Sequence, residues 1–94
     1  MPEKMLCALI ATDKPGHLQT RLDNRDAHLA YARDSGKLVM AGPFIDDEGA
    51  MSGTLLVIEV ETMQEAYDFA GNDPYAKAGL FEKVRIEQWK KVIG

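Results

Sequence analysis

The chain has 94 residues, with 15 acidic and 11 basic side chains and a formal net charge of -4. This acidic balance argues against a nucleic-acid-binding protein, which needs a basic surface to neutralise phosphates. The single cysteine, Cys7, excludes an internal disulfide and a cysteine-rich metal site, and it fits a reducing compartment. There is no apolar run long enough for a membrane span, and the Met-Pro-Glu-Lys start has no signal-peptide pattern, so we expect one cytoplasmic domain over residues 1–94.

The first third of the chain changes from a strand pattern to a helical one. Residues 5–11 are continuously apolar, which predicts a short strand covered on both faces, and residues 13–16 predict a turn. The period then becomes helical over residues 15–35, and Gly36 is predicted to end the helix. One stripe of this helix is apolar and is predicted to face the core: Leu18, Leu22, Leu29 and Ala32.

The rest of the chain predicts two further strands, a helix and a last strand. Residues 37–41 form the second strand, which Gly42–Pro43 is expected to end, and Gly53 is expected to mark a bulge or bend before a third strand over residues 54–61. Thr62 and Glu65 have the spacing of a capping box. The helix that they begin is expected to bury Met63, Ala66, Tyr67 and Ala70 and to end at Gly71–Asn72, before a strand over residues 83–92.

The predicted order is β-α-β-β-α-β, which is the ferredoxin-like arrangement of the α+β class. A four-stranded antiparallel sheet of this kind carries both helices on one face. The strands near residues 5–11 and 54–60 are nevertheless apolar on both of their faces, and no predicted element remains to cover the second one. We therefore expect a homodimer in which the sheets of two copies pair face to face.

Charged residues of the first helix lie beside its apolar stripe rather than opposite it. At about 100° per residue, Arg25 falls inside the apolar sector, and Arg21 and His28 fall on its shoulder. One interpretation is that Arg25 extends past the core and His28 is a half-exposed bystander. The other is that His28 acts as a general acid or base beside an arginine that holds an anion. Periodicity leaves both open.

Asp73 also has two interpretations, and they are compatible. An aspartate before Pro74 is a good helix start, because its carboxylate caps free N–H groups. The same carboxylate could accept a ring N–H of His28 and fix its tautomer. For other polar or reactive groups we expect structural roles: a buried thiol at Cys7 and a solvated turn at residues 46–48. Neither histidine has a partner at the spacing of a zinc site, so no metal is expected.

Four segments, in order and at fitting separations, resemble the YCII-related (YciI-like) family over nearly the whole chain. They are Arg25-Asp26-Ala27-His28-Leu29, Gly36-Lys37-Leu38 with Ala41-Gly42-Pro43, Gly53-Thr54, and Asp73-Pro74-Tyr75-Ala76-Lys77-Ala78-Gly79-Leu80. The resemblance implies the ferredoxin-like fold of the dimeric α+β barrel superfamily. It also implies an active site around a histidine and an aspartate, whose matching positions here are His28 and Asp73.

Some members of the family dechlorinate chlorinated hydroxyquinols, so the resemblance implies a small-molecule enzyme. The expected reaction is an elimination, dechlorination or isomerisation by proton transfer, without metal or cofactor, on an unidentified organic substrate of anionic or phenolic character. The alternatives are a non-catalytic metabolite-binding module and a structural or regulatory dimer. Tyr75 is most simply a core or interface residue by composition, but its segment places it with the site. In the enzyme reading His28 and Asp73 are catalytic, and the substrate is bound by Arg21, Arg25, Gly42, Pro43 and Tyr75.

Overall fold

A computed structural model of the protein describes residues 4–94. Residues 1–3 lie outside the described residues, and they belong to the start of the chain, where the sequence predicts no signal peptide. The elements in chain order are β1 (Met5–Asp13), α1 (Leu18–Asp34), β2 (Leu38–Ile45), β3 (Met51–Val60), α2 (Met63–Asn72), α3 (Pro74–Lys77) and β4 (Phe81–Trp89). None of the helices over residues 4–94 is long and apolar enough to cross a membrane.

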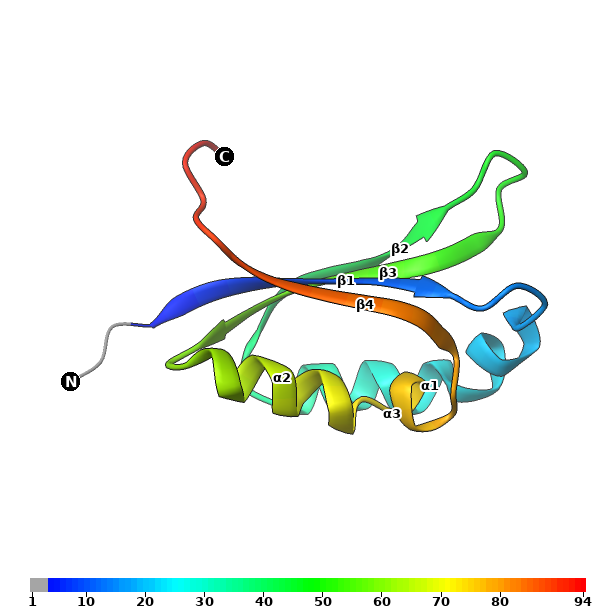
Figure 1. The fold of residues 1–94 in the computed structure, drawn as a ribbon, viewed down its shortest axis with the longest axis horizontal. Coiled ribbons are helices and arrows are strands. Elements are labelled where there is room, and N and C mark those ends of the chain that lie inside the picture. The colour runs from blue at the N-terminus through cyan, green and yellow to red at the C-terminus, as the bar shows by residue number, and fades with distance from the viewer. Residues whose placement is uncertain (1–3) are drawn as a thin grey trace.

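The four strands form one sheet in the order β2-β3-β1-β4, with antiparallel neighbours throughout. All three helices lie on the same side of this sheet (Figure 1). The ferredoxin-like α+β fold is therefore confirmed. The register sets Cys7 beside Ile58 and Leu9 beside Leu56, so that these four side chains point toward the helices.

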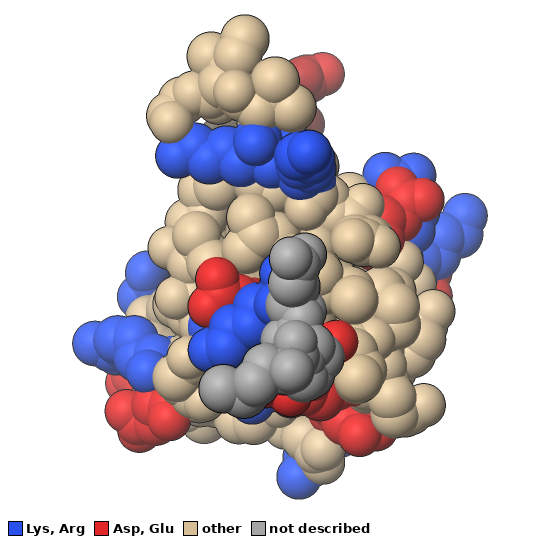
Figure 2. Space-filling view, turned by 90° about the vertical axis from the view of Figure 1, so that its left-hand side faces the viewer, with Lys and Arg blue, Asp and Glu red and all other residues tan. Residues whose placement is uncertain are grey.

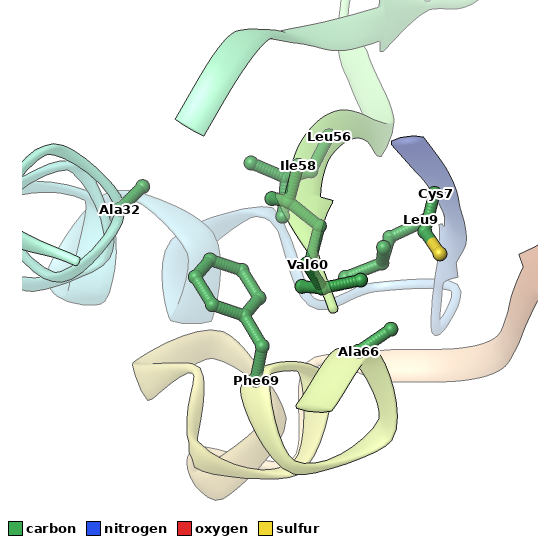
Figure 3. Close-up of a cluster of buried hydrophobic side chains, with 8 residues drawn as sticks. All are labelled: Cys7, Leu9, Ala32, Leu56, Ile58, Val60, Ala66 and Phe69. Carbon is green, nitrogen blue, oxygen red and sulfur yellow. The ribbon is translucent and has the colours of Figure 1, made fainter. Parts of the chain in front are cut away.

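The core lies between the helices and the two central strands. Its buried cluster combines side chains of β1 and β3 with Ala32 of α1 and with Ala66 and Phe69 of α2. Figure 3 shows the ring of Phe69 pointing from α2 toward Ile58 and Val60. The predicted capping box at the start of α2 is present: the Thr62 side chain accepts the N–H of Glu65, and the Glu65 carboxylate accepts that of Thr62.

The predicted inner face of α1 is wrong. Leu18 and Leu22 are 44% and 47% exposed, whereas the helix buries Arg21 and His28 along with Ala32. The true inner face is rotated by roughly a quarter turn from the leucine stripe. The charged residues are buried because other elements supply partners for them, which counting apolar residues along the helix does not detect. Tyr67 of α2, also expected in the core, is 52% exposed.

The second strand does not end at Gly42–Pro43, as the sequence suggested, but continues to Ile45. β2 is an edge strand that pairs only with β3, so proline is tolerated where its nitrogen faces away from the ladder. This extension carries Ala41, Gly42 and Pro43 along the upper part of β3, next to Thr54. It matters for the site, because these residues form one of its walls.

Gly53 lies inside β3 rather than before it, and the expected irregularity is present there, because the pairing of β3 with β2 shifts register between Phe44, the partner of Gly53, and Ile45. A Cβ atom at this position would overlap the carbonyl oxygen of Ala11 on the neighbouring strand and press on the ring of Phe44. Glycine is therefore required for the close approach of β3 and β1. That approach fixes the position of Thr54, the next residue along.

The face of the sheet opposite the helices is covered by no element over residues 4–94 (Figure 1). By strand alternation it carries Met40, Phe44 and Trp89, which are 48%, 41% and 39% exposed. The C-terminal segment after β4 rises on this side, away from the helices. Figure 2, which views the end near the N-terminus, shows acidic and basic side chains interspersed beneath that segment.

Candidate active site

A cavity of about 160 Å³ lies between α1, α3 and the β2–β3 side of the sheet. It is lined by polar side chains on one wall and by apolar and glycine residues on the other. The lining residues are Arg21, Arg25, His28, Leu29, Ala41, Gly42, Pro43, Met51, Thr54 and Tyr75. Six of the seven residues predicted for the site therefore line one cavity, and the seventh, Asp73, lies directly behind it in contact with His28.

His28 and Asp73 form a buried pair at the back of this cavity. Nδ1 of His28 lies 2.8 Å from Oδ1 and 2.9 Å from Oδ2 of Asp73, and the residues are 4% and 1% exposed. An ionised carboxylate only accepts hydrogen bonds, so Nδ1 must carry the hydrogen that joins the two. Nε2 has no hydrogen-bond partner within residues 4–94, and it is left with a lone pair at the cavity.

Asp73 is held by the backbone at the start of α3, where it is also the N-cap. Its Oδ1 accepts the N–H of Tyr75 at 2.9 Å, and Pro74 takes the first position of the helix. The interpretation of Asp73 as a helix cap is thus correct, and it coexists with the contact to His28. Because two donors fix one carboxylate, the imidazole meets a rigid partner.

Tyr75 packs flat against His28. The two ring centroids are 4.0 Å apart with an angle of 12° between the planes, and Tyr75 is 1% exposed. Burial raises the pKa of the Tyr75 phenol, although the positive charges of Arg21 and Arg25 oppose this effect. The phenol is therefore neutral at physiological pH. The sequence suggested a core residue from composition and a site residue from its segment, and Tyr75 is both buried and part of the cavity lining.

Arg21 is also buried, and its hydrogen bonds are mostly internal. Its Nε donates to Oδ2 of Asp13 at 2.7 Å, and its Nη2 donates to Oδ1 of Asp13 at 2.9 Å and to Oγ1 of Thr54 at 2.7 Å. Burial lowers the pKa of Arg21, but the hydrogen bonds and charge of Asp13 outweigh it, so the net pKa is raised. The guanidinium is permanently charged, and Asp13 neutralises it.

Arg25, Gly42 and Pro43 lie on the open side of the cavity. Arg25 is exposed one turn after Arg21 on α1, and it has no ion pair among residues 4–94. Gly42 and Pro43 belong to the extended part of β2 and present backbone and ring atoms with no charge. The cavity thus has one arginine that is already neutralised and one that is free to attract an anion.

Two site residues escaped the sequence analysis, Asp13 and Thr54. Asp13 was assigned to a turn, but it ends β1 and pairs with Arg21. Thr54 was assigned only to a strand. A signal for it existed, because it stands in line with Leu56, Ile58 and Val60 on the inner face of β3, where a polar side chain needs a buried partner.

No three histidine, cysteine or carboxylate side chains within residues 4–94 gather as a metal site requires. Cys7 is fully buried in the core, away from the cavity, and burial raises the pKa of its thiol. This agrees with the structural role that the sequence predicted for it.

The YCII-related domain family matches residues 5–90. The chain belongs to this family. Protein YciI of Escherichia coli O6:H1 is 38% identical over 98 residues, which cover 95% of this chain and all of that protein. An uncharacterised protein of Haemophilus influenzae is 35% identical over the same coverage.

Among solved structures, this chain is similar to the 5-chloro-2-hydroxyhydroquinone dehydrochlorinase TftG of Burkholderia phenoliruptrix AC1100, in complex with 2,5-dihydroxybenzoquinone. The TM-score is 0.83 at 40% identity, over 92% of this chain and 94% of the dehydrochlorinase. The putative antibiotic biosynthesis monooxygenase from Bacteroides thetaiotaomicron has a TM-score of 0.61 at 9% identity, over 97% and 91% of the two chains. The second likeness shows the fold alone.

Proposed function

We propose that this YCII-related chain is a small-molecule enzyme in which His28 and Asp73 act together in proton transfer. The observation that carries the proposal is the geometry at the back of the cavity. Asp73 binds Nδ1 of His28 at 2.8 Å, and Nε2 remains without a partner among residues 4–94. This tautomer leaves a basic nitrogen in a cavity that Tyr75 and Thr54 also line.

His28 and Asp73 have different roles in general-base catalysis. Nε2 of His28 takes a proton from a substrate hydroxyl or carbon, and the ring becomes an imidazolium whose charge Asp73 offsets. Asp73 keeps its own position because the Tyr75 N–H holds it at 2.9 Å. Assistance of this kind contributes about 10²–10⁴ in rate. In the reverse direction the imidazolium returns the proton, so the same pair serves an elimination or an isomerisation.

The cavity favours a substrate with a single ring and an acidic oxygen. Its volume is about 160 Å³, and an apolar cavity of about 150 Å³ holds benzene. Arg25 lines the cavity without an ion pair among the described residues, so it can bind an oxyanion opposite His28. TftG, at 40% identity, acts on a chlorinated hydroxyhydroquinone and binds 2,5-dihydroxybenzoquinone, which is a single oxygen-rich ring.

For a chlorinated substrate, the step would be a dehydrochlorination. In the keto tautomer of the substrate, one hydroxyl proton has moved to the chlorine-bearing carbon, which is then tetrahedral. His28 accepts the proton of a second ring hydroxyl, the electron pair of that O–H bond forms a carbonyl, the adjacent ring double bond shifts toward the tetrahedral carbon, and chloride leaves with the electrons of the C–Cl bond. The products are a hydroxybenzoquinone, one chloride ion and one proton on His28, so atoms and charge balance. Arg25 would stabilise the oxyanion that forms as the proton leaves.

The test combines ligand binding with turnover. We expect calorimetry to detect 2,5-dihydroxybenzoquinone binding to the wild-type protein. We also expect chloride to be released from 5-chloro-2-hydroxyhydroquinone at a rate that His28→Gln lowers at least tenfold with the fold intact. His17→Gln is the matched control, because His17 lies outside the cavity at the start of α1. Equal chloride release by the wild type and His28→Gln would remove His28 from the reaction.

Binding without chemistry is the second function that the cavity permits. In that case the quinone would bind with the same dependence on Arg25, and any chlorinated or isomerisable ring compound would be recovered unchanged. The binding module would then replace the enzyme as the interpretation.

We also propose that the protein acts as a homodimer whose sheets face each other. The support is the apolar sheet face, where Met40, Phe44 and Trp89 are each more than a third exposed in the single chain. A second copy would cover this face, since the helices occupy the other side (Figure 1).

A further inference from the structure

A chain of contacts links Arg21 to His28 through Tyr75, along one wall of the cavity. Cζ of Arg21 lies 4.7 Å from the centroid of the Tyr75 ring, and that ring stacks on His28 at 4.0 Å. Arg21 and His28 are seven residues apart on α1, which is two turns of the helix. The tyrosine, from α3, thus fills the space between two side chains of one helix.

Arg21 is poorly suited to bind substrate directly. A guanidinium has five N–H donors, and Asp13 and Thr54 engage the one on Nε and two on Nη2. Its side chain is 3% exposed, and its charge is balanced by Asp13. What the fork of hydrogen bonds does supply is a fixed orientation, because a planar group held at three points cannot tilt.

We propose that Arg21 is a positioning residue: anchored by Asp13 and Thr54, it holds the Tyr75 ring flat against His28 and so fixes the direction in which Nε2 meets the substrate. This inference rests on the proposed function of His28. The bond to Asp73 alone leaves the imidazole free to rock about its Nδ1, and a ring stacked at 12° removes that freedom. The guanidinium of Arg21 also attracts the electron-rich face of the Tyr75 ring, and this cation–π contact helps to hold the ring in place.

The direct test is the ring-current shift of the His28 C–H protons, which stacking on Tyr75 moves upfield. We expect Asp13→Asn with Arg21→Met, which removes both charges of the buried ion pair, to reduce this shift while circular dichroism shows an intact fold. Arg21→Lys keeps the charge beside Asp13 but loses the planar fork, and we expect an intermediate shift. Tyr75→Leu defines the complete loss, and Arg25→Met, which changes the other cavity arginine, is expected to leave the shift unchanged.

The kinetic readout separates this inference from the proposed function. We expect the turnover number of the double variant to fall about tenfold to a hundredfold, as for a misplaced catalytic group, with KM changed much less. Unchanged His28 shifts in a folded Arg21→Lys or double variant would overturn the positioning role. A wild type that turns over no ring compound would overturn the proposed function, while the proton shifts would still decide the role of Arg21.

Discussion

The carboxylate of Asp73 lies 2.8 Å from Nδ1 of His28, although the two residues are 45 positions apart in the chain. The contact exists because α1 and the start of α3 lie on the same side of the sheet. It uses a carboxylate that a local motif has already fixed in place. A helix cap has thus become the partner of a buried histidine, and the site inherits the rigidity of the cap.

The first prediction concerns the tautomer of His28. Asp73→Asn can donate an amide N–H to Nδ1, so we expect the ring hydrogen to move to Nε2 and the base to be lost. Nitrogen NMR of the imidazole should show the change, and chloride release from the chlorinated hydroxyhydroquinone should fall about 10²-fold or more. Asp68→Asn, which changes an exposed carboxylate of α2, is the control. An unchanged tautomer in Asp73→Asn would contradict the pairing.

The second prediction concerns the free arginine of the cavity. Arg25→Gln should weaken binding of 2,5-dihydroxybenzoquinone, whose hydroxyls are acidic, by about tenfold, which corresponds to ~1.4 kcal/mol. The thermal midpoint should hardly change, because Arg25 is exposed and has no ion pair among the described residues. Calorimetry with Arg33→Gln as the control provides the measurement. Equal affinities of the two variants would mean that the anion does not meet Arg25.

The third prediction is a loss of stability in alkaline solution. Burial raises the pKa of the phenols of Tyr75 and Tyr31 above their ordinary value of 10.0. Their contribution to stability is therefore complete below that pH, and it is lost as the pH rises toward the folded-state pKa. Thermal midpoints above about pH 10 should fall, and Tyr75→Phe should flatten the fall. Tyr67→Phe, at an exposed site, should leave it as in the wild type.

The fourth prediction contrasts two glycines. Gly53→Ala would drive a methyl group into the Ala11 carbonyl, and we expect it to lower the free energy of unfolding by about 1–3 kcal/mol. Gly71→Ala meets no atom and lies inside α2, so it should raise that free energy by about 0.5–1 kcal/mol. Urea denaturation of both variants decides the matter. If both substitutions lowered the free energy of unfolding, the conformational freedom of glycine, rather than the close approach of β1 and β3, would explain the effect at Gly53.

The fifth prediction concerns assembly. Phe44→Lys places a charge on the apolar sheet face, where the phenylalanine is 41% exposed in the single chain. Sedimentation equilibrium should find a dimer for the wild type and a monomer for Phe44→Lys, because a buried like-charge pair opposes association. Leu22→Lys, on the outer surface of α1, is the control. A wild type that sediments as a monomer at micromolar concentration would contradict the proposed dimer.

The sequence was informative wherever a signal was local. The β-α-β-β-α-β order, the capping box at Thr62 and the cap at Asp73 each depend on neighbouring residues, and each is confirmed. The prediction of the inner face of α1 was wrong because the partners of its buried residues are not local. Arg21 and His28 are buried by partners at Asp13, Thr54 and Asp73, which three other parts of the chain supply, and no periodicity within the helix reports them.

The site residues were found through the family resemblance more than through geometry. From the helical pattern alone, His28 could have been a half-exposed bystander, and its contact with Asp73 was one of two interpretations of that carboxylate until the resemblance favoured it. Asp13 went unnoticed because a carboxylate before a turn is common, and Thr54 because threonine suits a strand. Both residues bind Arg21, and the Gly53-Thr54 segment of the resemblance indicated only the start of a strand.

The burial of charge on α1 has a consequence for how the molecule opens. Within α1, which the structure describes in full, Ala32 is the sole apolar side chain that is fully buried. The helix is therefore attached to the sheet mainly by directional polar contacts, while α2 inserts Phe69 into the core. On heating, α1 should detach as a cooperative unit before the sheet melts, with faster amide exchange than β1 or β3. A ligand that binds the cavity only when α1 is attached would stabilise the attached state and slow that exchange. The exchange rate of α1 would then report how much of the protein has ligand bound.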